Sequence, residues 1–186
     1  MSRSFFCEVD YYIAKNIGKR FEENWMKSVP DDVLYYRPPD SAQSFGTNNK
    51  IRFSRKSPCD CMMFDGNLFY VLELKSVGTK SISFERKESD KGVIHKHQIN
   101  SLMKFSKYNH VVSGFIFDFR ISHKTYFIFI DDFCSMINNI EKMSFNEEDI
   151  FKYCSPIEID KTMLKVNWRY NINKFLNDSY MNYVKK

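Results

Sequence analysis

The sequence predicts an α/β fold in which helices flank a mixed central β-sheet. The predicted elements follow the order helix, strands, helix, strands, helices, which is typical of an α/β sandwich. The 186 residues, of which 43% are hydrophobic and 27% charged, can bury a core without a partner. The chain has neither internal repeats nor a low-complexity linker, so we expect one domain over residues 1–186.

The chain begins with an amphipathic segment. Apolar side chains at helical spacing predict a helix over about residues 8–28, which should end before Pro30. Residues 33–37 then predict a short strand. The sequence turns polar after it, and we expect residues 38–56 to form a projecting basic loop or short stalk.

A β-hairpin is predicted next. Residues 59–64 and 67–76 are largely apolar runs of strand length, and Asp65-Gly66 between them is a hairpin turn signal. Side chains alternate between the two faces of a strand, so this turn determines which residues share a face.

The remaining elements are predicted from the apolar pattern. Residues 79–92 are polar without a period and predict a loop, whereas residues 95–109 predict a helix. Residues 111–119 and 124–130 predict two further strands.

The segment 131–186 is expected to be a helical C-terminal portion. Asp131 or Asp132 suits the N-cap of a helix through about Ile140. Residues 146–154 and 170–184 also predict helices.

Two charged residues interrupt the second strand of the predicted hairpin. Glu73 and Lys75 share one face because they are two residues apart. A two-residue turn pairs Asp60 with Val71, on that same face and diagonal to Glu73. A four-residue loop would place Asp60 directly opposite Glu73, and a three-residue loop would turn it to the other face.

Two carboxylates and an ammonium group on one face suit hydrolysis of a phosphodiester. Asp60 and Glu73 offer oxygen ligands to Mg²⁺, for which we expect Mn²⁺ to substitute. A metal-held water could then attack phosphate, with Lys75 orienting it or stabilising the developing charge. On these residues alone, a strand end whose charges meet water is the alternative interpretation.

The motifs that surround these residues resemble a known nuclease superfamily. Pro58-Cys59-Asp60 followed by Glu73-Leu74-Lys75 resembles the P-D…(D/E)-x-K core motif. Gly18-Lys19-Arg20-Phe21-Glu22 is similar to the Gly-x₃-Glu helix start of junction resolvases. Ser83-Phe84 followed by His95-Lys96-His97-Gln98-Ile99 resembles a passage of the RecU-type Holliday junction resolvases of bacteria and phages.

This resemblance covers about residues 15–130 and implies a restriction-endonuclease-like core. The implied activity is Mg²⁺-dependent cutting of four-way DNA junctions, in DNA recombination and repair. Two symmetric cuts imply a homodimer. The residues that would carry the activity are Asp60 and Glu73 as metal ligands with the Leu74 carbonyl, Lys75 as catalytic lysine, Glu22 near the metal, and Gln98 at the site or substrate.

The sequence also departs from the RecU-type pattern. Cys59 stands where that family tends to have a hydroxyl residue, and residues 38–56 are shorter and more polar than the family's stalk. Two alternatives therefore stay open. One is another nuclease of the superfamily, acting on duplex, flaps or ends, and the other is a non-catalytic DNA-binding protein on this fold.

Positive charge is concentrated in the front of the chain. Residues 1–130 carry 20 Lys and Arg against 14 Asp and Glu, whereas residues 131–186 carry 8 against 9. A basic portion favours nucleic acid as partner. The candidate DNA-binding residues are Arg37, Lys50, Arg52, Arg55, Lys56 and His97. The four cations of residues 50–56 have an alternative interpretation, a basic edge strand that resists aggregation.

Cysteine spacing and apolar content indicate the compartment. The five cysteines match no disulfide framework, which favours a reducing cytosol. No signal peptide or membrane span is expected, because no apolar run is long enough. We expect the cytoplasm of a bacterium or a phage-infected host. Cys59 and Cys61 should face away from Asp60, and their spacing to His95 and His97 disfavours a zinc site.

Overall fold

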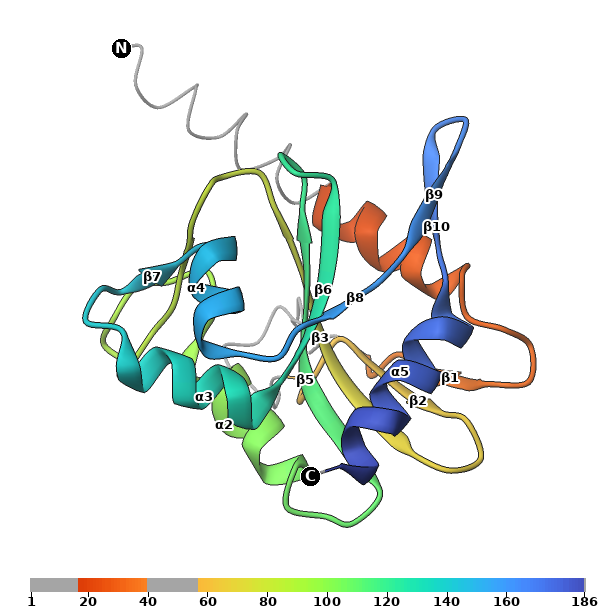
Figure 1. Ribbon diagram of the computed structural model, residues 1–186, viewed down its shortest axis with the longest axis horizontal. Coiled ribbons are helices and arrows are strands. Elements are labelled where there is room, and N and C mark those ends of the chain that lie inside the picture. Colours follow the sequence, from red (N-terminus) through yellow and green to blue (C-terminus); the bar gives the residue numbers. More distant parts are fainter. Residues whose placement is uncertain (1–16, 40–56, 186) are drawn as a thin grey trace, which may run out of the picture.

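The computed structural model describes residues 17–39 and 57–185, and its centre is a six-stranded sheet (Figure 1). Its strands, in spatial order, are β1 (Leu34–Tyr36), β2 (Cys61–Phe64), β3 (Phe69–Val77), β5 (Val111–Phe119), β6 (Lys124–Phe129) and β8 (Ile157–Glu158). The central pair, β3 and β5, is parallel, and the other neighbours are antiparallel. The sheet is therefore mixed, as predicted.

Helices cover both faces of this sheet (Figure 1). One face is covered by α2 (Lys96–Phe105), α3 (Ile130–Asn139) and α4 (Glu147–Tyr153). The other is covered by the first helix, described over residues 17–26, and by α5 (Ile172–Val184). The predicted α/β class with a helix-flanked mixed sheet is confirmed.

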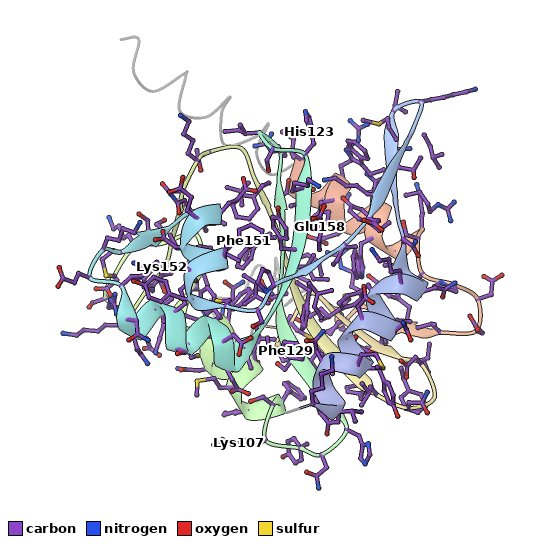
Figure 2. All side chains as sticks on the ribbon, in the orientation of Figure 1. Lys107, His123, Phe129, Phe151, Lys152 and Glu158 are labelled. Carbon is purple, nitrogen blue, oxygen red and sulfur yellow. The ribbon has the colours of Figure 1, made fainter. Side chains whose placement is uncertain are left out.

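Alternation along the central strands divides the interior into two cores, which the side chains fill (Figure 2). Val71 of β3 and Phe117 of β5 pack on the α2 and α3 side. Leu72 and Ile116, which are adjacent to them in the sequence, pack on the side of the first helix and α5. Burial of both faces explains why β3 and β5 read as continuous apolar runs.

The hairpin turn differs from the prediction. Phe64 pairs with Phe69, so residues 65–68 form a four-residue loop and the predicted two-residue turn is wrong. The Asp65 carboxylate accepts hydrogen bonds from the N–H groups of Asn67 and Leu68, each at 2.8 Å, and this side-chain contact closes the wider loop. The loop has an even number of residues, as the predicted turn does, so Asp60 still lies on the face of β3 that carries Glu73 and Lys75.

Several short strands lie where none was predicted. β4 (Ile82–Ser83), inside the predicted loop, pairs with β7 (Ser144–Phe145). β9 (Lys161–Leu164) and β10 (Asn167–Tyr170) form a hairpin beside the first helix (Figure 1). The segment after Asp131 thus holds strands as well as three helices.

The start of α3 also differs from the prediction. The helix begins at Ile130, directly after β6, and its N-cap is Phe129 rather than an aspartate. Asp131 and Asp132 lie in its first turn, where negative charge is favourable at the helix N-terminus. Among the described helices, none is both long and apolar enough to cross a bilayer.

Candidate active site

The carboxylate of Asp60 is fixed at the point where β2 begins. Cys61 pairs with Leu72, so Asp60, one residue earlier, lies opposite Glu73. Its Oδ2 accepts a hydrogen bond from the Leu74 N–H at 2.8 Å, and its own N–H donates to the Leu72 carbonyl at 3.1 Å. The N–H and C=O of one strand residue point to the same side, so the Leu74 carbonyl lies on the side of Asp60.

Glu73 and Lys75 form an ion pair on that face of β3. Lys75 Nζ lies 2.9 Å from Glu73 Oε1, and the side chains are 18% and 4% exposed, respectively. The carboxylate is therefore buried, whereas the lysine side chain is partly exposed. The structure brings Asp60, Glu73 and Lys75 together at one end of the hairpin.

Gln98 links this group to α2. Its side-chain amide donates a hydrogen bond to Glu73 Oε1, and its Oε1 accepts one from the His95 N–H at 2.9 Å. The second contact belongs to the capping box at the start of α2. Gln98 is thus held by the helix terminus and in turn orients the Glu73 carboxylate.

Glu22 of the first helix lies at the same end of β2, on the other side of the sheet. It pairs with Arg37, whose Nη2 is 2.7 Å from Glu22 Oε2. Burial raises the pKa of Tyr35 well above its ordinary value, and the charges of Glu22 and Asp60 add to this shift. Both carboxylates therefore act on Tyr35 of β1, a residue that the sequence did not single out.

The environment of Glu73 favours its protonated form. Burial, reinforced by the nearby Asp60 carboxylate, raises the pKa of Glu73 from 4.5 to about 7, although Lys75 acts in the opposite direction. One ammonium group does not compensate two adjacent carboxylates in a site shielded from water.

These residues fit a hard divalent cation. Asp60 lies opposite Glu73, and its negative charge contributes to the raised pKa of Glu73, so the two carboxylates form a pair with too little positive charge beside it. Within residues 17–39 and 57–185, no three His, Cys, Asp or Glu side chains converge on one point. Two carboxylates and the Leu74 carbonyl would leave several positions to water, as Mg²⁺ prefers.

The raised pKa predicts how stability without metal depends on pH. A carboxyl group whose folded pKa lies above its unfolded value stabilises the fold below pH 4.5, and this contribution is lost as pH rises through about 7. In a chelating buffer, we expect wild type to lose up to about 3 kcal/mol over this range relative to Glu73→Gln. Urea unfolding of both proteins at several pH values measures the difference, and parallel curves would contradict it.

Glu85 is a further contributor that the sequence did not reveal. Its carboxylate accepts a hydrogen bond from the Lys96 N–H at 2.9 Å and lies 2.8 Å from His95 Nδ1. It therefore fastens the first turn of α2, which carries Gln98. Glu85 belongs to a segment predicted as a loop, and nothing in its sequence context distinguishes it from a solvated acid.

Other candidate residues lie elsewhere. Lys50, Arg52, Arg55 and Lys56, with nearly all of the predicted loop at 38–56, are outside the described residues. Arg37 is at the surface beside Glu22. The His97 ring stacks on that of His95, with centroids 5.4 Å apart, close to the start of α2.

The two cysteines of the motif were expected on one face, and this is wrong. Cys61 packs with Leu72, whereas Cys59 packs with Val71 on the side of α2. β2 begins only at Cys61, so strand alternation does not extend to Cys59. Burial raises the pKa of the Cys59 thiol to about 12, which suits a packing role. Since the cysteines are separated by the sheet, they form no zinc site with His95.

Comparisons with known proteins place the chain in a family. No family model matches it. In structure it is similar to Hjc, a Holliday junction resolvase from the archaeal hyperthermophile Archaeoglobus fulgidus, with 14% identity and a TM-score of 0.49, over 76% of this chain and 95% of that one. In sequence it is 34% identical over 173 residues to the SPbeta prophage-derived uncharacterized protein YotM of Bacillus subtilis (strain 168), covering 87% of this chain and 85% of the relative. The chain therefore belongs to the family of YotM.

Proposed function

We propose that the protein is a metal-dependent endonuclease of the P-D…(D/E)-x-K type that cuts four-way DNA junctions. The observation that carries this proposal is the position of Asp60 directly opposite Glu73, with Lys75 on the same face. Oxygen donors and a cation that share one face of a strand pair can act together on one phosphate. The motif resemblance and this geometry are separate arguments for the same residues.

Asp60, Glu73 and the Leu74 carbonyl would hold Mg²⁺ or Mn²⁺, which supplies positive charge and makes a coordinated water more acidic. The Leu74 N–H keeps the Asp60 carboxylate at the strand end. Gln98 is a positioning residue, because it acts through Glu73. Glu22 lies at the same end of β2 on the other side of the sheet, so in this proposal it influences the site through water or through its charge rather than as a direct ligand.

Lys75 is the residue that meets the substrate in this proposal. Its ammonium group is the more exposed partner of the Glu73 pair. It can donate a hydrogen bond to a non-bridging phosphate oxygen, where charge develops during attack, and can orient the attacking water. Cleavage of the P–O3′ bond would leave a 5′-phosphate and a 3′-hydroxyl.

The substrate and the assembly are proposed together. A four-way junction has two equivalent strands to cut, so we propose a homodimer with one site in each protomer. Lys50, Arg52, Arg55, Lys56, Arg37 and His97 remain our candidates for contacts with DNA phosphates. A role in recombination and repair, in the cytoplasm of a bacterium or phage-infected host, is in keeping with the prophage origin of the relative.

A panel of DNA substrates tests this proposal. An immobile four-way junction, a duplex of the same sequence and a flap are each incubated with the protein in Mg²⁺, Mn²⁺ or chelator. We expect paired symmetric nicks in the junction, dependent on the divalent ion, and much slower cutting of the other substrates. Preference for duplex or flap would assign the site to another nuclease activity. Tight junction binding without any cutting would identify a binding protein instead.

A further inference from the structure

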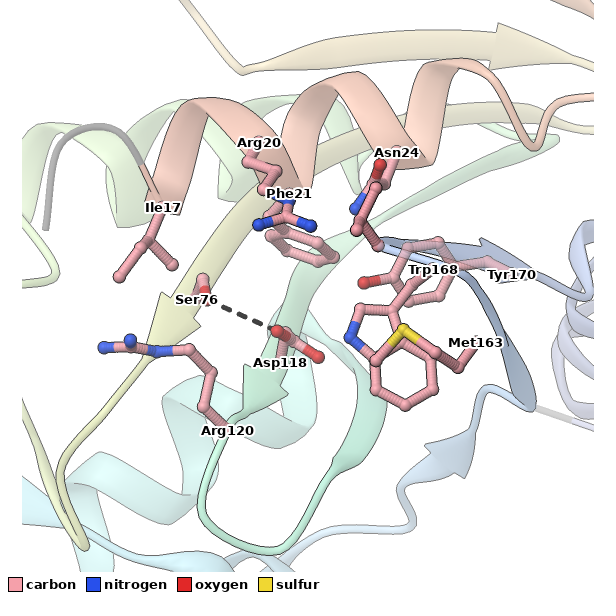
Figure 3. A pocket seen from close by; sticks show the side chains of 11 residues that line it. Ile17, Arg20, Phe21, Asn24, Ser76, Asp118, Arg120, Met163, Trp168 and Tyr170 are labelled. Atoms are coloured by element: carbon pink, nitrogen blue, oxygen red, sulfur yellow. Dashed lines mark hydrogen bonds between the residues drawn. The ribbon is translucent and has the colours of Figure 1, made fainter. Parts of the chain in front are cut away.

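A second polar pocket lies on the face of β3 opposite Lys75. Ser76 follows Lys75 in the strand, so its side chain points to the other side of the sheet. There the first helix, the end of β5 and the β9–β10 hairpin enclose a pocket of about 290 Å³ (Figure 3). None of Asp60, Glu73 and Lys75 lines it.

Two arginines give this pocket its charge. Arg20 comes from the first helix and Arg120 from the turn after β5 (Figure 3). Across the described parts of the chain, neither guanidinium group has an acidic partner, and Arg120 Nε is buried without an acceptor. A buried donor without an acceptor is costly, so it indicates a site for a ligand that accepts hydrogen bonds.

The carboxylate in the pocket does not neutralise these arginines. Asp118 accepts hydrogen bonds from Thr125 Oγ1 at 2.9 Å and from Ser76 Oγ at 3.3 Å, and it forms an ion pair with Lys161. Its charge is thus compensated within the protein. The two arginines are left as the excess charge of the pocket.

The position of Arg120 depends on a glycine. A Cβ atom built on Gly78 would lie 1.9 Å from Arg120 Nη2, so the guanidinium group rests against bare backbone at that point. The opposite wall is aromatic and apolar. Lys161 Nζ lies 4.8 Å from the centroid of the Trp168 ring, which helps to hold that ring in the wall.

We propose that this pocket binds a nucleotide through its phosphate group. The planar guanidinium fork matches the oxygens of phosphate, and two unpaired forks provide the charge that phosphate carries. Phe21, Trp168 and Met163 offer apolar contact for the sugar and base. The volume is close to the lower limit of small-ligand sites. The ligand is either a free mononucleotide or one nucleotide of a DNA strand, since both present the same group.

Calorimetric titrations of the full chain test the phosphate contact. The probes are deoxyadenosine 5′-monophosphate, deoxyadenosine and a short oligothymidylate. We expect the monophosphate to bind and deoxyadenosine to bind far more weakly. The Arg20→Gln/Arg120→Gln double variant should lose about 10- to 100-fold in affinity for the monophosphate. Arg169→Gln is the matched control, because Arg169 is exposed and lies between Trp168 and Tyr170, on the other face of β10.

Further measurements separate the sources of the ligand and keep the test decisive. Competition between oligothymidylate and the monophosphate assigns the pocket to a DNA strand, and absence of competition assigns it to a free nucleotide.

Gly78→Ala, which keeps both charges, should weaken binding by displacing Arg120, and thermal unfolding verifies that each variant is folded. Asp60→Asn should bind as wild type does, so failure of the nuclease proposal leaves this result unaffected. Equal binding of deoxyadenosine and its monophosphate, no binding of any probe, or unchanged binding by the folded double variant would overturn the proposal.

Discussion

Lys75→Ala is expected to lower the rate of junction cleavage by about 10²- to 10⁴-fold while leaving the protein folded. The Lys75 ammonium group is the cation placed beside the paired carboxylates, 2.9 Å from Glu73, and it is accessible to a phosphate. Its loss removes a donor to the developing charge without removing any ligand oxygen. Single-turnover cleavage of a labelled junction in Mg²⁺ measures the effect.

Three further variants make this result specific. Asp60→Ala should reduce cleavage at least as strongly, because it removes one of the two carboxylates. Gln98→Ala should have a smaller effect that higher Mg²⁺ concentration partly restores, because Gln98 only orients Glu73. Lys80→Ala removes an exposed lysine just beyond β3 and should cut as wild type does. If metal-dependent cutting survives in both Lys75→Ala and Asp60→Ala, the site assigned here is wrong.

Lys161→Ala is expected to destabilise the fold by about 3–5 kcal/mol, the largest loss of stability that we predict. Lys161 and Asp118 form an ion pair whose side chains are only 5% and 8% exposed. Removing the lysine leaves the Asp118 carboxylate buried with only hydroxyl partners, Thr125 and Ser76. Urea unfolding at neutral pH measures the loss.

A surface ion pair in the same region is the control. Lys124 pairs with Glu158 of β8, and these side chains are 51% and 44% exposed. Lys124→Ala should therefore cost less than about 1 kcal/mol. The double variant Lys161→Met/Asp118→Leu should recover most of the lost stability, because it removes both buried charges. A cost for Lys161→Ala as small as that for Lys124→Ala would show that the buried pair contributes little.

The long elements could be predicted because their apolar patterns are unambiguous. β5 spans Val111–Phe119, the predicted range, since a largely apolar segment of nine residues that is rich in Val, Ile and Phe and bounded by polar residues has few other interpretations. The two-residue strands β4, β7 and β8 contain too few residues to show a period. Their pairing depends on contacts between distant segments, such as Ile82 with Phe145.

For the candidate site, the sequence was sufficient to predict which side chains share one face of the sheet. An even loop places Asp60 on the face of Glu73, whatever its length, and the sequence favoured an even loop. The exact length depended on the Asp65 side chain, whose hydrogen bonds to the backbone favour four residues. The enclosure of Glu73 and its contact with Gln98 arise only when α2 packs on the sheet, so a local reading could not give them.

The arginine pocket could not be predicted from the sequence. Arg20, Ser76, Arg120 and Trp168 lie in four separate segments, and no pattern in the sequence relates them. Trp168 is half-buried and forms part of the pocket wall, a position that its neighbours in the sequence do not indicate.

The central position of β3 has a consequence for hydrogen exchange. β3 pairs with β5 along its whole length and with β2 along half of it, and both its faces are covered. Amide protons in such a strand are expected to exchange with solvent only when the entire domain unfolds. The backbone that carries Glu73 and Lys75 would then show the slowest exchange in the protein. If the protein changes conformation to bind substrates of different shape, we expect the change to occur in peripheral segments rather than in this strand.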